Sequence, residues 1–415
     1  MFRWFQRKRN LPELPVTQHS IVTWERDHVR AGVVRLEKGT AQLMGVSAVS
    51  VHGINGNSYP DVERWCEGCE EALTQAEDMT PSACGHKIVP DYVTMSLPSD
   101  VTSSLCVTVS QRRDQPGRGM TMEEMEALLV RGYRKAQDIL STREERANQR
   151  IIHGSVSRVD LDGKTLVDPM GIQGEEITLD MGFCLTSTEW IRALEIISER
   201  LKLQLTHLIP HYVLYATPLP DASSLLVLLD QDYSLVSAVR RGKVAWARHT
   251  DIGEREIIRS TGRRLDLTEH QTDALMRTYR AAKLQEKAEV RLAGVFWQEL
   301  CRWMKSLAGE VEEGREDGSV PHHVYFLDMS RHMPEARSCL ETPFWERSLP
   351  FASCPDITEL KVNMIRDVLD CTAKASGSPY LLLRGLAQYV ARIYVNENSF
   401  DRALLENIDW RHSSL

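Results

Sequence analysis

Four side chains of metal-binding type lie close together in the sequence. Cys66 and Cys69 are spaced as C-x-x-C, and Cys84 and His86 follow them. Structural zinc sites use four such ligands, which tight turns hold in a tetrahedron. The C-x-x-C pair, however, lies within residues 58–78, where apolar residues recur every three or four positions, as on one buried helix face. We therefore favour cysteines packed on a helix face and expect no metal ion.

The other residues that could do chemistry form no known catalytic pattern. His322, His323 and His332 lack a nearby cysteine or a well-spaced acid, so we interpret them as histidines at strand ends. The sequence contains no G-x-S-x-G, H-E-x-x-H or Walker motif. Covalent or metal-assisted hydrolysis would need residues that only the fold brings together.

The composition is that of an ordinary globular chain. The 415 residues include 58 acidic and 50 basic side chains, which give a net charge of −8 and a pI near 5.9. This balance gives no overall electrostatic attraction to nucleic acid, which we exclude as a partner. The nine cysteines form an odd number and no secretory segment is evident, so we expect reduced thiols in the cytoplasm. No apolar run reaches the ~18 residues that a membrane span needs.

The N-terminus combines aromatic and basic side chains. Its aromatic residues are Phe2, Trp4 and Phe5, and its cations are Arg3, Arg7, Lys8 and Arg9. Such a segment could make weak contact with an anionic membrane surface or dock on a partner. The alternative is a frayed, solvated terminus.

Hydrophobic periodicity predicts an α/β protein. Strands are expected over Ile21–Trp24, Ala31–Glu37, Gln42–His52, Asp91–Leu97, Ser104–Ser110, Arg150–Val159, Glu176–Leu185 and Leu205–Pro210. Helices are expected from Asp61 as N-cap, over Thr121–Leu140, Thr188–Leu203, from Thr268, over Lys287–Leu307, Asp356–Asp370 and Pro379–Tyr394. Thr121 with Glu124, and Thr268 with Gln271, are typical of capped helix starts. The acidic segment Gly309–Ser319 is expected to be a solvated loop.

Residues 91–210 follow the order strand, helix, strand, strand, helix, strand, which is typical of a ferredoxin-like α+β unit. A loop inside it carries Asp168, Pro169, Gly171 and Gly174. Proline and glycine in these places give an exposed loop of defined shape, and we expect it to make assembly contacts.

Two sequence motifs in this region resemble those of the FtsA family of bacterial cell-division actin homologues and of its relative PilM of type IV pilus assembly. The resemblance rests on Arg150-Ile-Ile-His-Gly-Ser-Val-Ser-Arg-Val-Asp-Leu-Asp-Gly and Val167-Asp-Pro-Met-Gly-Ile-Gln-Gly-Glu-Glu-Ile, and it extends in order over about residues 20–395. It implies a two-lobed, actin-like (ribonuclease-H-like) ATPase fold with an inserted α+β subdomain of the SHS2 or ferredoxin-like type. The implied parts are an N-terminal tip at 1–19, a first lobe at 20–98, the insertion at 99–209, a second lobe at 210–375, and a return to the first lobe with a tail at 376–415.

The same resemblance implies a nucleotide site, and the sequence departs from it there. Actin-type ATPases cradle phosphates with glycine-rich hairpins, because a residue without a side chain lets backbone N–H groups approach. Thr23 stands where the first hairpin carries an aspartate. In the second hairpin the aspartate is present only as Asp230 or Asp232, and Gln231, Tyr233 and Ser234 replace the glycines and threonines. Asp328 begins the segment where an adenosine loop is expected. We therefore expect a pseudo-ATPase without a cofactor. The alternative is that Thr23, Asp230, Asp232, Ser234 and Asp328 still bind ATP and magnesium in an altered geometry.

The resulting functional hypothesis is a cytoplasmic scaffold, not an enzyme, that assembles with itself at the inner face of the membrane. By resemblance, its partners are a tubulin-type division filament or the cytoplasmic tail of a membrane-bound pilus or envelope protein. The tail 400–415 has an apolar set, Phe400, Leu404, Leu405, Ile408 and Trp410, among acids. This charge suits a groove on a protein better than an anionic bilayer. The alternative is an active ATPase whose polymerisation depends on nucleotide.

Overall fold

The computed structural model describes residues 18–25, 27–37, 39–51, 61–143, 146, 148–220, 223–315, 320–329, 333–395 and 400–410. They form two compact units. The first takes the described residues of Met1–Asp221, Arg240–Trp246 and Lys361–Leu415, and the second those of Ala222–Val239 and Ala247–Leu360. Within the described part of the chain, no helix is both long and apolar enough to cross a membrane.

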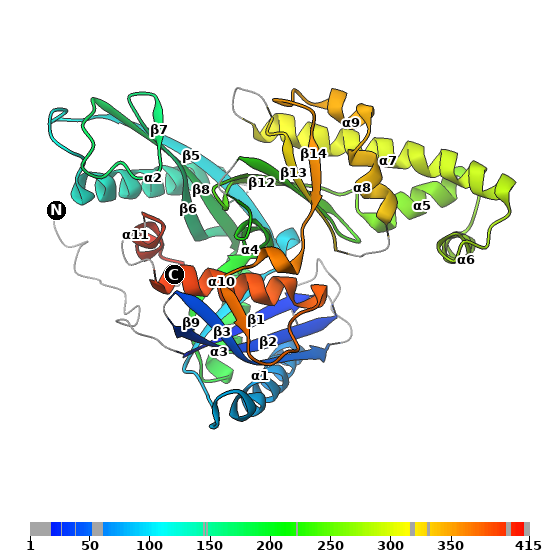
Figure 1. The fold of residues 1–415 in the computed structure, drawn as a ribbon, viewed down its shortest axis with the longest axis horizontal. Helices are drawn as coiled ribbons and strands as arrows, with labels where there is room; N and C mark the ends of the chain where they lie inside the picture. Colours follow the sequence, from blue (N-terminus) through cyan, green and yellow to red (C-terminus); the bar gives the residue numbers. More distant parts are fainter. Residues whose placement is uncertain are drawn as a thin grey trace. The chain divides into compact units, whose positions relative to one another are not determined.

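The first unit is built on a mixed six-stranded sheet in the order β15-β3-β2-β1-β4-β9. Its strands are β1 (Gln18–Glu25), β2 (His28–Glu37), β3 (Thr40–Ser50), β4 (Tyr92–Leu97), β9 (Gln204–Pro210) and β15 (Val368–Asp370). The helices of this part are α1 (Val62–Cys84), α3 (Thr188–Arg200), α4 (His211–Ala216) and α10 (Leu381–Val395). Helix α1 covers one face of the sheet and α10 the other, so the sheet is buried on both sides (Figure 1).

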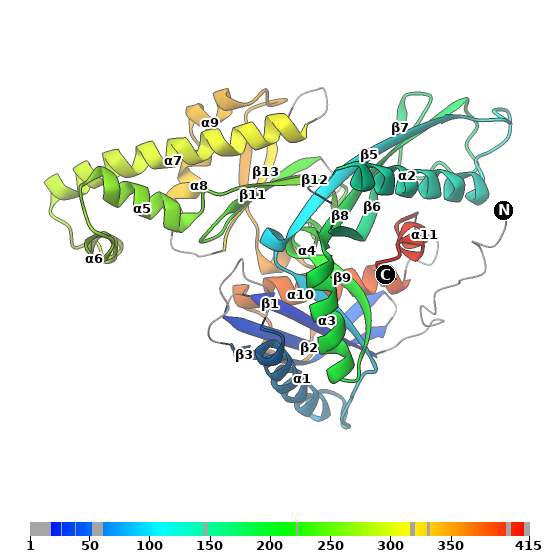
Figure 2. The same cartoon turned by 180° about the vertical axis from the view of Figure 1, so that it is seen from behind.

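The inserted part of the first unit has its own antiparallel sheet, in the order β5-β8-β6-β7. Its elements are β5 (Thr102–Arg112), α2 (Met122–Thr142), β6 (Gln149–Leu161), β7 (Lys164–Leu166) and β8 (Glu176–Ser187), preceded by the short 3-10 helix Ser99–Val101. Helix α2 packs along this sheet (Figure 2). The strands expected for residues 91–210 therefore divide between two sheets, because β9 pairs in parallel with β4.

The second unit contains a five-stranded sheet in the order β12-β11-β10-β13-β14. Its strands are β10 (Ser224–Leu229), β11 (Ser234–Arg240), β12 (Lys243–Thr250), β13 (His323–Asp328) and β14 (Asp356–Glu359). The last residue of β11 and the part of β12 up to Trp246 belong to the first unit. Its helices are α5 (Glu254–Arg264), α6 (Glu269–Arg280), α7 (Glu286–Gly314), α8 (Pro334–Leu340) and α9 (Pro343–Ser348). Trp303 of α7 and Leu228 of β10 are fully buried.

The predicted helix starts are confirmed. Asp61 accepts a hydrogen bond from the Arg64 backbone N–H at 3.3 Å, and Thr121 and Glu124 form a reciprocal capping box. A second capping box joins Thr268 and Gln271 at the start of α6. Side-chain oxygens thus satisfy backbone N–H groups that have no partner within the helix.

Two predictions in the last third of the chain are wrong. Asp356–Asp370 is not a helix but β14, the 3-10 helix Val362–Met364 and β15. Ile357 pairs with Val324 and Val368 with Ala41, so strand partners outweigh the helical spacing of the apolar residues. The start of the acidic segment is also helical, because α7 continues to Gly314.

The tail, whose charge was expected to suit a groove on a protein, packs on its own chain. Helix α11 (Phe400–Asn407) packs against α2 and β6 of the inserted part. Leu404, Ile408 and Trp410 are buried there. The Asp401 carboxylate accepts a hydrogen bond from the Val156 N–H at 2.8 Å and pairs with Lys243 at 2.7 Å.

Three of the buried histidines of the first unit lie beside hydroxyl groups. His19 is 2.7 Å from the Thr94 hydroxyl through Nε2, and His211 is 3.0 Å from the Ser96 hydroxyl. The third, His153, is 3.2 Å from the Tyr389 hydroxyl. Burial lowers the pKa of His19 and of His211 to about 3, and that of His153 to about 4. Each ring is therefore neutral in the folded protein at neutral pH.

These histidines predict acid sensitivity. Their pKa values fall below the ordinary value of 6.5 in the fold, so the unfolded chain binds more protons between about pH 4 and 6.5. The stabilising effect of keeping them neutral is complete above pH 6.5 and is lost as the pH falls. Each contributes a slope of about 1.4 kcal/mol per pH unit. Urea denaturation between pH 7 and pH 4 should show the free energy of unfolding falling with pH. His153→Asn should reduce the slope of this free energy against pH by the amount that corresponds to about one bound proton. An unchanged slope in that variant would contradict the assignment.

Candidate functional site

The turn between β10 and β11 carries two of the candidate acids. Leu229 pairs with Ser234, and Asp230, Gln231, Asp232 and Tyr233 lie between them. The Asp230 N–H donates to the Tyr233 carbonyl at 3.0 Å, and the Asp230 carboxylate accepts from the Gln231 N–H at 2.6 Å. No residue of this turn is among those with positive φ. The turn therefore closes without glycine. One of its backbone N–H groups, that of Gln231, is already hydrogen-bonded to the Asp230 carboxylate.

The start of helix α5 holds this turn in place. The Glu254 N–H donates to the Asp230 carbonyl at 2.9 Å, and the Arg255 N–H donates to the Gln231 carbonyl at 2.8 Å. The Arg255 guanidinium also binds the Asp232 carboxylate at 2.9 Å and the Gln231 side-chain oxygen at 3.0 Å. Helix N-termini bind anions through free N–H groups of this kind. Here two of those groups bind backbone carbonyls.

The candidate hydroxyl of Ser234 is buried in the second unit. It donates to the Ile252 carbonyl at 2.6 Å and accepts from the Trp303 indole N–H at 2.8 Å. The side chain is fully buried. Its hydrogen bonds therefore join β11 to α7 and to the segment before α5.

Asp328 ends β13, which runs parallel to β10, so Asp328 is level with Leu229. Its carboxylate accepts from the Met333 N–H at 2.9 Å, just before α8. The structure thus places Asp230, Asp232, Ser234 and Asp328 at the same end of neighbouring strands. Three carboxylates near one sheet edge could in chemical terms attract Mg²⁺. Within the described residues, however, no group of three His, Cys, Asp or Glu side chains could hold a metal ion.

Thr23 belongs to the other unit. It is fully buried in β1, and the described residues give its hydroxyl no hydrogen-bond partner. The next residue, Trp24, stacks on Trp65 of α1 with ring centroids 4.2 Å apart. Glu25 forms an ion pair with Arg30, and burial raises the pKa of its carboxyl. Arg26 lies outside the described residues. Trp24 is thus used in packing against α1, and Glu25 in an ion pair within the hairpin.

The predicted interaction loop is shaped by hydrogen bonds to residues before α2. Asp168 accepts from the Met170 N–H at 2.9 Å, and the Gly171 N–H donates to the Met120 carbonyl at 3.0 Å. Gly174 donates to the Pro116 carbonyl at 3.2 Å. Asp168 and Gly171 are exposed and Gly174 is half-buried, but Pro169 is buried, which corrects its expected exposure.

The sequence reasoning missed the apolar residues that this loop displays. Val167 is 79% exposed and Ile172 is 41% exposed. Both are contiguous with the predicted residues, and their exposure depends on a backbone path that periodicity does not reveal. The other predicted interaction residues, Phe2, Trp4 and Phe5, lie outside the described part.

The cysteines of the zinc candidate lie on α1, as the helical spacing predicts. Cys66 and Cys69 are buried, and burial raises the pKa of both thiols. The Cys84 thiol lies 3.2 Å from the carbonyls of Thr80 and His86. These contacts are those of helix packing and of a helix end.

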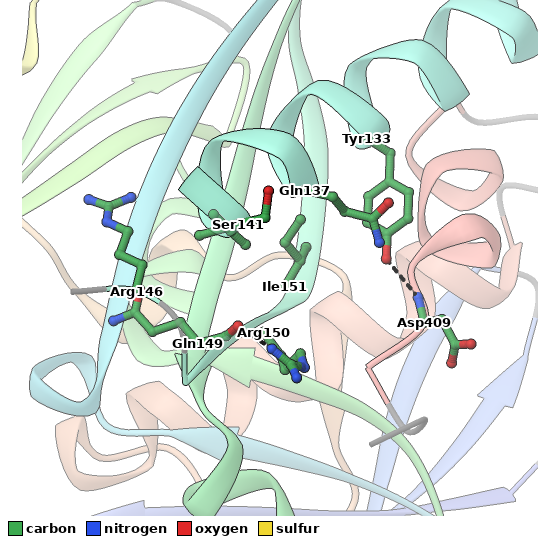
Figure 3. A pocket seen from close by; sticks show the side chains of 9 residues that line it. Tyr133, Gln137, Ser141, Arg146, Gln149, Arg150, Ile151 and Asp409 are labelled. Atoms are coloured by element: carbon green, nitrogen blue, oxygen red, sulfur yellow. Dashed lines mark hydrogen bonds between the residues drawn. The ribbon is translucent and has the colours of Figure 1, made fainter. Parts of the chain in front are cut away.

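A pocket of about 400 Å³ in the first unit was not predicted at all (Figure 3). Residues from α2, from β6 and the segment before it, and from the C-terminal segment line it. They are Tyr133, Gln137, Leu140, Ser141, Arg146, Gln149, Arg150, Ile151 and Asp409. The Asp409 N–H donates to the Tyr133 hydroxyl at 3.2 Å. Since Asp409 is distant in sequence from residues 133–151, which supply the rest of the lining, only the fold could reveal the pocket.

Ser234 and Ser237 allow a matched test of how firmly the second hairpin is fixed. Ser234→Ala leaves the Trp303 N–H and the Ile252 carbonyl without this partner, and should destabilise the protein by about 1 to 3 kcal/mol. Ser237 is equally buried on the same strand, but the described residues give its hydroxyl no partner. Ser237→Ala should therefore be neutral or slightly stabilising. Urea denaturation compares the two, and equal effects would contradict this account.

Comparison with known proteins establishes the fold. No family model matches the chain, and no curated protein matches its sequence. Among solved structures, the "PilM-PilN type IV pilus biogenesis complex" matches 92% of this chain and 99% of its own with a TM-score of 0.57 at 12% identity. Ethanolamine utilization protein EutJ from Carboxydothermus hydrogenoformans matches 91% of each chain with a TM-score of 0.43 at 9% identity. The ROK hexokinase from Thermus thermophilus matches 90% of this chain and 98% of its own, with a TM-score of 0.41 at 13% identity. The predicted two-lobed actin-like fold with an inserted α+β subdomain is confirmed.

Proposed function

We propose that this chain is an actin-like scaffold of the FtsA and PilM type that does not hydrolyse ATP. The observation that carries the proposal is the attachment of the 230–233 turn to the start of α5. An actin-type phosphate site needs glycines and backbone N–H groups directed at the nucleotide. This turn has no glycine, and two N–H groups of α5 already bind its carbonyls.

The energetic argument points the same way. A phosphate that took over the Glu254 and Arg255 N–H groups would leave two carbonyls without donors and would compete with the ion pair between Asp232 and Arg255. Each hydrogen bond lost at a partly buried site costs about 1 kcal/mol. The carboxylates of Asp230 and Asp232 would also repel a phosphate unless Mg²⁺ lay between them. Self-assembly and recruitment then remain as the function.

A specific observation also supports the alternative of nucleotide binding. Asp230 and Asp232 are half-exposed, and Asp328 ends the neighbouring parallel strand. Together they could bind a magnesium nucleotide in an altered geometry, in which polymerisation would depend on ATP. A nucleotide-independent filament is a third form of the same scaffold, and sedimentation of the purified protein without ligand would identify it.

Calorimetric titration with ATP and magnesium separates the first two functions. We expect no heat of binding at millimolar nucleotide, because the carbonyl groups of the turn and the first N–H groups of α5 are already hydrogen-bonded to each other. Asp230→Ala with Asp232→Ala is the matched variant. Micromolar binding that this double variant abolishes would replace the scaffold proposal with an ATP-dependent one.

The proposed partner is the cytoplasmic segment of a membrane-bound pilus or envelope protein, at the inner face of the membrane. The motifs of residues 150–163 and 167–177 support this choice, and so does the similarity of fold to the PilM in a PilM-PilN complex. A tubulin-type division filament is the alternative partner. Self-association is proposed through the loop 167–174 of the inserted part.

The loop gives a direct test of self-association. Val167→Asp combined with Ile172→Asp puts two charges on side chains that are 79% and 41% exposed, so folding should be little affected. If these residues are buried between copies, the dissociation constant of the assembly should rise about tenfold or more. Sedimentation velocity over a concentration series measures this. Val89→Asp, at a residue 58% exposed elsewhere in the same unit, is the control. Equal behaviour of both variants would exclude the loop as the contact.

A further inference from the structure

A groove between helices α7 and α8 has the form of a small-molecule site. Its volume of about 350 Å³ lies within the range of such sites, about 300 to 1,000 Å³. Helix α7 lines it with residues spaced by three and four, which share one face of a helix: Ala293, Phe296, Trp297 and Leu300. Tyr279, near the end of α6, lines it as well. All the lining residues belong to the second unit, so this unit supplies the whole site.

Two of the aromatic side chains in the groove remain partly accessible. Trp297 is 40% exposed, whereas Trp303 on the same helix is fully buried. Tyr279 is half-buried, and its ring lies at 64° to that of Phe296 with centroids 6.4 Å apart. The face of an aromatic ring carries partial negative charge and attracts cations. The groove therefore offers a surface for a cation that also has apolar groups.

The one charged residue among those that line the groove is Glu335 of α8. Its Oε1 atom accepts a hydrogen bond from the Tyr279 hydroxyl at 2.7 Å. In the described part of the chain, which leaves out residues 330–332 before α8, this carboxylate forms no ion pair. Glu254 and Glu299 of the same unit each pair with an arginine instead. The charge of Glu335 is therefore not matched by a basic group of the groove.

A second carboxylate acts on the same end of the groove. Glu289 is exposed on α7, one turn before Ala293. Burial, the hydrogen bond to Glu335 and the negative charges of Glu335 and Glu289 raise the pKa of Tyr279 to about 12. The Tyr279 hydroxyl therefore stays protonated and keeps donating to one oxygen of Glu335. A carboxylate has two oxygens, so the other can face a ligand.

We propose that this groove binds a small free organic ammonium ion, whose charge lies beside Glu335 and whose apolar groups lie against Trp297 and Tyr279. A trimethylammonium group suits both walls, because it combines a positive charge with methyl groups. Cation–π attraction is stronger when the cation leaves water, as it does in a half-buried groove. The proposal is independent of the scaffold function.

The experiment uses the full-length chain and choline as the probe, observed by saturation-transfer difference NMR. Neohexyl alcohol, in which a carbon atom replaces the nitrogen of choline, is the matched neutral ligand. We expect choline to bind about tenfold or more tightly than the alcohol. Glu335→Gln keeps an oxygen that accepts from Tyr279 but removes the charge. It should weaken choline binding about fivefold and leave binding of the alcohol unchanged.

Two further variants separate the aromatic wall from a general effect of charge. Trp297→Leu keeps an apolar side chain without an aromatic face, and should weaken choline binding about threefold. Glu346→Gln, at an exposed acid of α9, makes the same change of charge as Glu335→Gln and should have no effect. Glu335 and Trp297 are both partly exposed, so folding should be little affected.

The proposal is overturned if neither ligand binds, if the alcohol binds as tightly as choline, or if Glu335→Gln and Glu346→Gln behave alike. Phosphatidylcholine vesicles test the source of the cation, since their headgroup carries the same trimethylammonium group. We expect no cosedimentation with them. Cosedimentation that Glu335→Gln abolishes would show that the groove takes a lipid headgroup, and would overturn the assignment to a free ion.

Discussion

The hydrogen bonds between the 230–233 turn and the first N–H groups of α5 constrain the chemistry of the second unit. A helix begins with N–H groups that have no partner inside the helix, and these must be satisfied by a side chain, a ligand or another part of the chain. Here the Glu254 and Arg255 N–H groups bind turn carbonyls, and the Arg255 side chain binds Asp232. A nucleotide would have to compete with the fold itself for these groups.

Much of the fold could be predicted from the sequence where the signal was local. The capping boxes at Thr121 and Thr268 depend on residues three positions apart, and both formed as expected. The helix expected over 356–370 did not form, because its residues find strand partners in β13 and β3. Those partners are distant in sequence, and spacing within the segment carries no information about them.

The candidate site shows the same limit. The residue types showed that Asp230, Asp232 and Ser234 are polar and that their turn contains no glycine. They did not show that the Ser234 hydroxyl forms hydrogen bonds to both Ile252 and Trp303. The exposure of Val167 and the burial of Pro169 follow from the path of one loop over Met120, which composition does not fix. Similarly, the charge and apolar pattern of the tail favoured contact with a protein, but they could not show that α2 and β6 of the same chain provide this contact.

The docked tail bears on the proposed role of the inserted part as an assembly surface. Strand β6 pairs with β8 along most of its length, but β7 pairs with only its last residues, 159–161. An unpaired strand edge invites pairing with other chains, and proteins commonly cover such edges. At Val156, the N–H group binds the Asp401 carboxylate, so the tail satisfies a backbone donor of β6. The same segment buries Leu404 and Ile408 and completes a pocket through Asp409. The tail therefore limits what can bind to β6, and a partner for this face must either accept the docked tail or displace it.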